Sequence, residues 1–513
     1  MTGAECLRII RHPAVTGSVL LIVVLWGWEA VFSPESVDYA VLHMQSYELQ
    51  APLLAPAAGV MLAANLAALR PYRYGTIGSY EALSLPAWRR SLALLLACVP
   101  PAVVVLLLSS LRMGQFGAAE GAVGRIEIAE VVAPAVVVVL AGWLGVLGAL
   151  LVHSVVLAPV ALAVLGLLAL VGLVSVDSPM RWLSFVAGED AFGPPLPSDL
   201  MYRPAGWHLV WLSALALAVL AVTLLLAGVR RRWGGAALVI ALALAVPAAT
   251  MQTRPVPERI ETARERLLLA PNVGQRCERR EQVTYCAFPE FVPYIDAWHE
   301  IVSAQLGSVS KDVAARRYAV RQRLSIPAAD EFGTSGAVPT KQWNELDASR
   351  GTPEAVSAPT SWSAGGQDSF AENEVLGFSA AFAFRVVSGK PIGGDGLTPA
   401  CGGRGAVVFW LATDATEDTR LALRTVMSHT SGGYGFSMPQ LGAASGPQFG
   451  PRELALGETM LARSETDRSA MARRVVSQWD ELTAPNTSVD DAARLLGLPR
   501  PPAAPTDEVV CES

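Results

Sequence analysis

His299 and Glu300 match the beginning of the HExxH pattern, in which two histidines one helical turn apart bind zinc and the glutamate acts as a base. The second histidine would stand at position 303, where the chain has a serine. The remaining histidines show no metal-ligand spacing; they are His12, His43, His153, His208 and His429. We therefore expect no metal site, and we interpret His299 as a packed or solvated helix residue.

Patterns that mark other active sites are also missing. The sequence has no GxSxG elbow of a hydrolase and no GxxxxGK[ST] loop to cradle a nucleotide phosphate. The stretch SHTSGGYGF at 428–436 places a serine beside a histidine, and we interpret it as a glycine-rich turn after a helix. We therefore expect this chain to carry no catalytic and no cofactor-binding residue, and not to be an enzyme.

The two halves of the chain differ in composition. Of the 513 residues, 52% are hydrophobic and 16% are charged, with a mean hydropathy of +0.39. Soluble chains usually hold about 25% charged residues. Up to Thr250 there are 13 basic and 13 acidic residues, and after it 26 and 32, so the net charge of −6 belongs to the second half. No clustered basic face is visible, so we expect no nucleic-acid partner.

The first half holds apolar runs of the length that crosses a bilayer, about 20 residues. We predict about seven transmembrane helices, at 15–28, 51–69, 91–111, two within 131–176 with a bend near His153, 207–229 and 234–250. The first run could be a signal peptide, but no small-x-small cleavage site follows it cleanly and six more spans come after it. We expect residues 1–252 to form an all-α polytopic membrane domain.

Arginines give the predicted orientation. With the N-terminus inside, the inner segments hold nine arginines and the outer loops hold four, the bias that normally fixes topology. The inner nine are Arg8, Arg11, Arg70, Arg73, Arg89, Arg90, Arg230, Arg231 and Arg232. We therefore predict a multi-pass protein of the plasma membrane whose residues 253–513 lie outside the cytoplasm. The long apolar runs lack charges, which disfavours a transporter driven by ions.

Four cysteines follow the last predicted span, as an oxidising compartment permits. Cys277 and Cys286 lie close together in CERREQVTYC, and we predict that they form a disulfide. Cys401 and Cys511 would then tie the chain end to the body of the domain. Four unrelated buried thiols are the alternative.

The second half is predicted to be a mainly helical extracytoplasmic domain with a little β-structure. Charge and apolar spacing predict helices within 255–271, after Pro293, and within 314–325, 417–430 and 464–482. The short apolar run GAVVFWLAT at 405–413 is a possible strand. Serine, proline and glycine at 352–369 predict an exposed loop.

The loop RPYRYGTIGSYEALSLPAWRR at 70–90 places four arginines between two apolar spans. Gly75 and Pro86 punctuate it, Thr76 can cap a short helix, and IGSYEAL forms a short amphipathic segment. Such a segment, bordered by basic residues, could fit a groove on a soluble partner. The alternative is an ordinary basic loop that fixes topology.

This loop resembles the coupling-helix region of type-2 ABC exporter permeases, especially actinobacterial ones. The basic N-terminus before the first span and RPAGWHLVWLSALALAVLAV at the sixth span resemble that family as well. The resemblance covers roughly residues 1–250. It implies an ATPase-coupling loop whose residues would include Arg73, Gly75, Thr76, Tyr80, Glu81, Arg89 and Arg90. The seventh span and the external domain depart from the six-span plan of the family.

The resemblance implies a permease subunit of an ABC transporter, expected to be an exporter. Its partners would be an ABC ATPase subunit that binds ATP and Mg²⁺, a second permease copy or a related permease, and membrane lipid. The alternative is a membrane-anchored sensor or hydrolase whose working part is the external domain. The sequence does not name the substrate.

Overall fold

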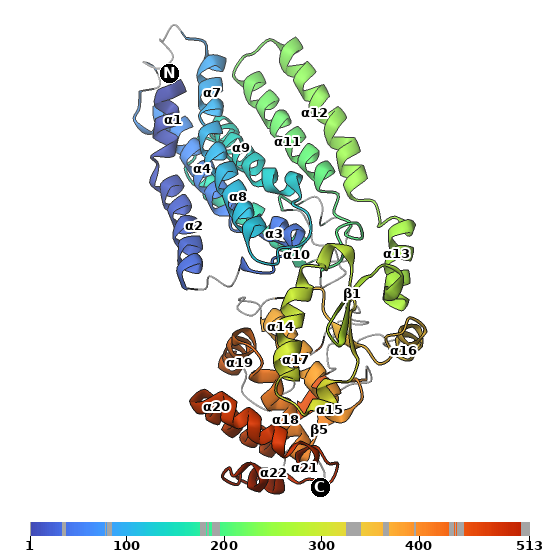
Figure 1. Cartoon of the computed structure of the whole chain (residues 1–513). Helices are drawn as coiled ribbons and strands as arrows, with labels where there is room; N and C mark the ends of the chain where they lie inside the picture. Colours follow the sequence, from blue (N-terminus) through green and yellow to red (C-terminus); the bar gives the residue numbers. More distant parts are fainter. Residues whose placement is uncertain are drawn as a thin grey trace.

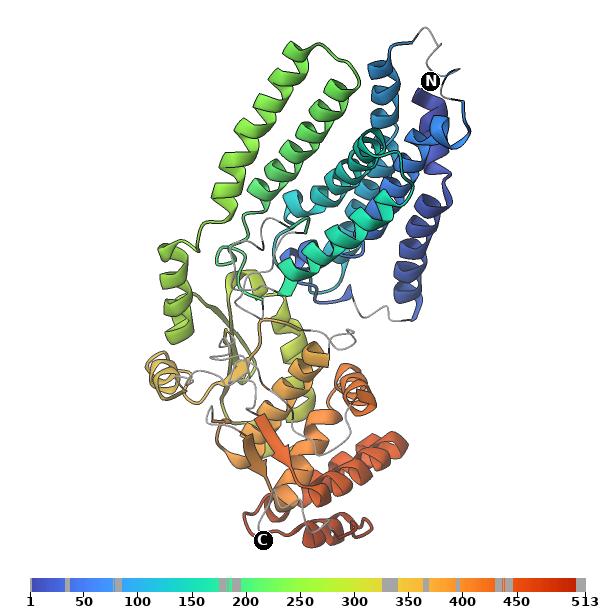
Figure 2. The same cartoon turned by 180° about the vertical axis from the view of Figure 1, so that it is seen from behind.

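The computed structural model describes residues 2–32, 37–76, 85–174, 195–324, 340–362, 369–393, 397–429 and 446–503, with isolated positions at 78, 181, 184–186, 436 and 438. A bundle of apolar helices leads at one end into a domain of helices and two small sheets (Figure 1). The N-terminus lies at the far end of the bundle, so the two chain ends are at opposite ends of the molecule (Figure 2).

Within the described residues, five helices are long and apolar enough to cross a membrane, as expected of a membrane protein. They are α2 (Pro13–Phe32), α7 with α8 (Ala87–Leu96 and Val99–Ala118), α9 (Ile128–Leu151), α11 (Ala205–Leu226) and α12 (Arg231–Gln252). Helices also occupy the other two predicted positions, α4 (Leu54–Ala68) and α10 (Leu157–Val174), but their apolar stretches are shorter. The bend near His153 separates α9 from α10, while seven spans stay a prediction.

Glycines bring the central helices of the bundle into close contact. A Cβ atom on Gly145 of α9 would lie 2.4 Å from the carbonyl oxygen of Met61 in α4. One on Gly59 of α4 would lie 2.5 Å from the carbonyl oxygen of Ala14 in α2. The Asn65 amide donates to the Gly145 carbonyl over 3.1 Å. Small residues of this kind let helix backbones approach closely where no hydrophobic driving force holds helices together in lipid.

The C-terminal part begins with α13 (Glu258–Leu269), shortly after α12 ends. A four-stranded sheet has the order β1-β2-β3-β4, antiparallel between β1 and β2 and parallel thereafter. Its strands are β1 (Arg276–Arg280), β2 (Val283–Ala287), β3 (Tyr318–Gln322) and β4 (Val356–Ala358). Short strands β5 (Leu397–Ala400) and β6 (Gly446–Phe449) form a second, parallel pair.

Helices make up most of the described remainder of this domain. Longer ones are α14 (Tyr294–Leu306), α16 (Thr340–Ser349), α17 (Ser369–Ser388), α18 (Gly402–Thr413), α19 (Glu417–His429), α20 (Pro451–Ser477) and α22 (Val489–Leu496). Short helices are α15 (Lys311–Ala314), α21 (Trp479–Leu482), η3 (Pro271–Val273) and η4 (Pro289–Phe291). At the end of the chain, Ser488 caps α22 and Gly497 closes it in the left-handed conformation, with φ of +61°.

Three local predictions in this domain are wrong. The segment predicted as a strand at 405–413 belongs to helix α18. Residues 405–413 are all buried in the domain core, which explains why the helix is apolar on all sides. The segment predicted as a helix at 314–325 contains strand β3, whose five residues are all buried and pair with β2 and β4. The predicted loop at 352–369 contains buried strand β4 and buried Trp362. In each case pairing or burial overrides the local pattern.

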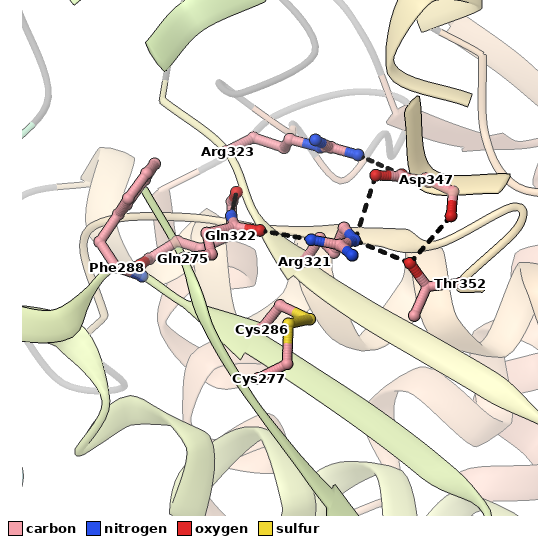
Figure 3. The surroundings of a disulfide bond; sticks show 9 residues. All are labelled: Gln275, Cys277, Cys286, Phe288, Arg321, Gln322, Arg323, Asp347 and Thr352. Carbon is pink, nitrogen blue, oxygen red and sulfur yellow. Dashed lines mark hydrogen bonds and ion pairs between the residues drawn. A yellow bond between two sulfur atoms is a disulfide. The ribbon is translucent and has the colours of Figure 1, made fainter. Parts of the chain in front are cut away.

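Charged groups tie the sheet to α16 (Figure 3). Asp347 is fully buried and pairs with Arg323 and, over 3.1 Å, with Arg321. Arg321 also donates to Thr352 and to Gln275. Burial raises the pKa of Asp347 above its usual value, against the opposing effect of the two guanidinium groups. Removing one partner of such a buried pair would leave an uncompensated charge.

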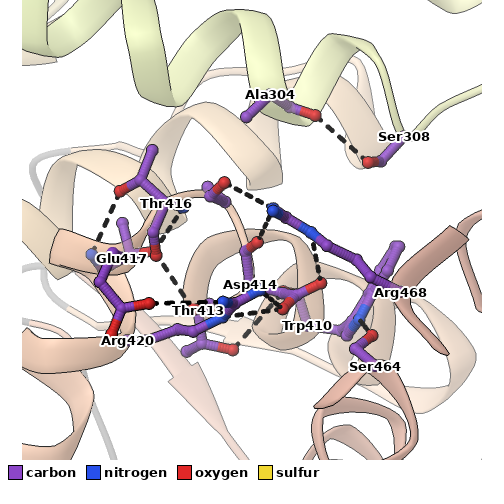
Figure 4. Close-up of polar contacts among 12 residues, drawn as sticks. Ala304, Ser308, Trp410, Thr413, Asp414, Thr416, Glu417, Arg420, Ser464 and Arg468 are labelled. Carbon is purple, nitrogen blue, oxygen red and sulfur yellow. Dashed lines mark hydrogen bonds and ion pairs between the residues drawn. The ribbon is translucent and has the colours of Figure 1, made fainter. Parts of the chain in front are cut away.

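A second charged cluster joins α18, α19 and α20 (Figure 4). Asp414, directly after α18, accepts from Arg420 over 2.7 Å and pairs with Arg468 over 3.3 Å. Arg468 also donates to the carbonyl oxygen of Ala415 over 2.6 Å. The Arg468 guanidinium thus donates to a backbone carbonyl just beyond the C-terminal end of α18, where a cation is favourable. We interpret both charged clusters as internal ties of the domain.

The glycine contacts generate a stability prediction. Gly145→Ala should destabilise the folded chain by about 1–3 kcal/mol, because the added methyl group overlaps the Met61 carbonyl and forces α4 and α9 apart. Gly166→Ala on α10 is the matched control, since a Cβ atom there has nothing within 4 Å. Thermal unfolding of both variants in the same detergent measures the difference. Equal stability of the two variants would show that close contact between α4 and α9 does not require a glycine at position 145.

Candidate functional site

The N-terminal helix and the beginning of the 70–90 loop lie together at the end of the bundle away from the C-terminal domain (Figure 1). The Glu5 carboxylate of α1 (Thr2–Ile10) pairs with Arg70 of α5 (Arg70–Arg73) over 3.2 Å. It also pairs with Arg8 over 2.8 Å. Helix α1 also contacts α7, which begins at Ala87 within the last part of the loop. Two segments separated by some 65 residues are thus brought into one surface.

The described residues of the predicted coupling loop are accessible on this surface. Arg73, Thr76 and Arg89 are exposed and Arg90 is half-buried. Gly75 has φ of +63°, which a residue with a side chain rarely adopts, so a glycine is required where α5 turns into the loop. Tyr80 and Glu81, also predicted to belong to the coupling loop, lie outside the described residues.

Other predicted inner arginines share this end of the bundle. Arg230, just before α12, and Arg231 and Arg232 in its first turn are exposed. Aromatic rings accompany the cations, with the Arg89 guanidinium 5.2 Å from the Trp88 ring and that of Arg232 5.5 Å from the Trp233 ring. Cations beside tryptophan are typical of a membrane–water boundary. We call the exposed arginines Arg8, Arg73, Arg89, Arg230, Arg231 and Arg232 the basic end.

The predicted Cys277–Cys286 disulfide is present (Figure 3). The two cysteines stand directly opposite each other in the β1–β2 hairpin. Cys401 is also disulfide-bonded. Its predicted partner Cys511 lies outside the described residues, so this pairing stays a prediction. Cys6 and Cys98, in the helix bundle, are free thiols.

The opposite end of the bundle contains a polar junction that the sequence did not reveal. The turn Pro197–Met201, between α10 and α11, is held on both sides by the C-terminal domain. The Glu290 carboxylate accepts from the Ser198 backbone N–H and hydroxyl, each over 2.6 Å. Arg264 of α13 donates to the Leu200 carbonyl through two nitrogens, at 2.9 and 2.7 Å. We call this arrangement the turn clamp.

His43 lies beside the turn clamp but does not complete a hydrolytic triad. The Ser198 hydroxyl lies 3.2 Å from His43 Nδ1, yet it donates to Glu290. The carboxylate therefore contacts the serine and not the imidazole, which a triad would require it to orient. Burial, together with the Arg203 charge, lowers the pKa of His43 to about 4, so the ring is neutral near pH 7. We interpret the group as a structural junction.

The junction continues into the first turn of α9 and into the hydrophobic core. Arg203, just before α11, pairs with Glu130 over 3.3 Å, and both side chains are almost fully buried. The Tyr294 hydroxyl donates to the Tyr39 carbonyl over 2.8 Å. Loop residues of the bundle share one buried cluster with Tyr294 and Trp298 of the C-terminal domain; they are Val41, Val123, Leu196 and Leu200. The buried core therefore crosses the predicted boundary at 252–253.

Elsewhere in the C-terminal domain, individual polar groups stand out. The predicted HExx residue His299 is half-buried, and its Nδ1 lies 3.1 Å from the Tyr285 hydroxyl. Glu374 of α17 is buried and accepts from Ser361, and burial raises its pKa to about 8. Among the described residues, no group of three or more histidine, cysteine, aspartate or glutamate side chains could hold a metal ion.

Comparisons with protein families, with curated proteins and with solved structures find no match to this chain.

The turn clamp generates a second prediction. Glu290→Gln should lower the free energy of unfolding by about 1.5–3 kcal/mol, because two hydrogen bonds to a charged acceptor are replaced by weaker ones. Asp199→Asn is the matched control, since the Arg125–Asp199 pair next to the clamp is exposed on both sides and should contribute less than about 1 kcal/mol. Chemical unfolding in detergent measures both. If Glu290→Gln is as stable as the control, the clamp does not hold the two parts together.

Proposed function

We propose that the chain is the membrane subunit of a type-2 ABC exporter, located in the plasma membrane with its C-terminal domain outside. A separate ATPase subunit would supply ATP hydrolysis, and a second permease copy or a related permease would complete the pore. The observation that carries the proposal is the Glu5–Arg70 contact, which joins α1 to the 70–90 loop on one accessible surface. The loop is the segment to which the family resemblance assigns ATPase coupling, and α1 is the basic N-terminal segment that resembles the same family.

The geometry of the two ends supports this proposal. The basic end and the C-terminal domain lie at opposite ends of helices long enough to cross a membrane. A partner in the cytoplasm would therefore meet α1 and the loop without meeting the C-terminal domain. Exposed guanidinium groups can steer an acidic partner and fix the orientation in which it docks.

Association with an ATPase tests the proposal. The full-length chain purified from its own cells should retain a subunit with ATP-hydrolysing activity. Arg73→Glu combined with Arg89→Glu should reduce the retained activity by about tenfold, corresponding to ~1.4 kcal/mol of binding free energy. Arg230→Glu combined with Arg231→Glu is the matched control, with the same charge change at the same end but outside the 70–90 loop.

Gly75→Pro provides an uncharged test of the same surface. Proline fixes φ near −65°, whereas Gly75 has φ of +63°, so the entry to the loop must change its path. Because the residue is exposed, the bundle should still fold while ATPase retention falls. Full retention in both loop variants would indicate a loop that only fixes topology. Hydrolase activity without any retained ATPase would favour a membrane-anchored enzyme.

Orientation is a separate prediction. In a Cys6→Ser background, Lys390→Cys should react with a membrane-impermeant maleimide added to intact cells, and Arg231→Cys should react only after lysis. Both positions are exposed, so accessibility to the reagent depends on the side of the membrane. Cys98, the other free thiol among the described residues, is buried. The reverse pattern of labelling would place the basic end outside and contradict the proposed function.

A further inference from the structure

The helix bundle contains a cavity of about 170 Å³ between α4, α9 and α10. Its described lining is apolar throughout. The residues are Leu54, Ala57, Ala58, Met61, Val137, Leu140, Ala141, Leu144, Leu162, Leu165, Gly166 and Phe185. A water molecule needs two to four polar partners, so water is not a suitable occupant of such a space. Apolar cavities of similar size, about 150 Å³, stay dry and accept apolar molecules such as benzene.

The position of the cavity along α9 indicates which apolar molecules can reach it. The lining residues of α9 lie at 137–144, near the middle of a helix that runs from Ile128 to Leu151. With a rise of 1.5 Å per residue, position 137 is about 13 Å from the helix start. For a membrane-spanning α9, this is the hydrocarbon layer, where lipid acyl chains are the surrounding medium.

The cavity also has a side through which a chain could enter. Several lining residues are only partly buried, among them Ala58, Leu144 and Leu165, and Gly166 is exposed. A Cβ atom on Gly166 would have nothing within 4 Å. On Gly145, where α9 packs against α4, it would lie 2.4 Å from the Met61 carbonyl oxygen. Helix α10 also exposes Val160, Val164, Leu167 and Leu168 by 52–60%. A Cβ atom on Gly148 of α9 would still lie 3.0 Å from Leu157 at the start of α10, so the packing is open beside Gly166 and not along the whole of α10.

We propose that this cavity is a binding site for one acyl chain of a bilayer phospholipid, which enters beside Gly166 and packs against α4 and α9. The site depends on the membrane position of α9 and not on the pairing of this chain with an ATPase. An experiment that contradicts the acyl-chain site therefore leaves the proposed function untouched, and the reverse also holds.

A photoreactive phospholipid tests the proposal. The full-length chain is reconstituted into nanodiscs with a phosphatidylglycerol that carries a diazirine in the middle of one acyl chain. After illumination, mass spectrometry should find labels on Met61 and Leu165 well above those on the outward-facing Val160 and Val164. An excess of unlabelled phosphatidylglycerol should suppress these labels. Labelling no stronger at the cavity than at the outer face of α10 would overturn the proposal.

Filling the cavity provides the matched variants. Ala58→Leu combined with Gly166→Leu places two side chains in the cavity and should reduce labelling of Met61 by about tenfold, or ~1.4 kcal/mol. Ala163→Leu adds the same side chain at an exposed position of α10 outside the lining, and should leave the labelling unchanged. Equal labelling in all variants would contradict the proposal. Cross-links from the lining to a second copy of the chain would show that a protein occupies the cavity instead.

Discussion

The two parts of the molecule are held together by hydrogen bonds to a five-residue turn of the bundle, Pro197–Met201. At its start a carboxylate accepts two hydrogen bonds, and at its end a guanidinium donates two to one carbonyl. Both charged groups belong to the C-terminal part, whereas the turn belongs to the bundle. Separating the parts would remove these hydrogen bonds from a buried guanidinium, a half-buried carboxylate and two backbone groups, which is costly. The C-terminal domain is therefore seated on the bundle and does not hang from a free linker.

The same junction reaches the long helices directly. The buried Arg203–Glu130 pair connects the start of α11 to the first turn of α9. A displacement of either helix must move this pair and, through the adjoining turn, the C-terminal domain. Under the proposed function, movement generated at the basic end would reach the outer domain through helices and not through a flexible loop. This offers a physical role for a domain that the six-span plan of the family lacks.

Packing within the bundle is uneven in a way that matters for lipid contact. Gly59 and Gly145 permit backbone contact among α2, α4 and α9, so that region has no room for even one methyl group. On the α10 side of α9, a cavity of about 170 Å³ remains. Close packing and an apolar space lie on adjacent faces of the same helix. The first stabilises the bundle, and the second is available to the surrounding acyl chains.

The sequence alone determined the features that depend on local composition. Long apolar runs predicted membrane-length helices because the bilayer requires about 20 apolar residues from each spanning helix. The nine-residue spacing of Cys277 and Cys286 allowed a disulfide, which the β1–β2 hairpin forms. Tertiary structure decided the rest. Segment 318–322 is a strand that pairs with β2 and β4, and 402–413 is a helix whose continuous apolar run is explained by burial in the core on all sides. The turn clamp unites Ser198, Arg264 and Glu290, and no local pattern can place residues so far apart in the chain beside one another.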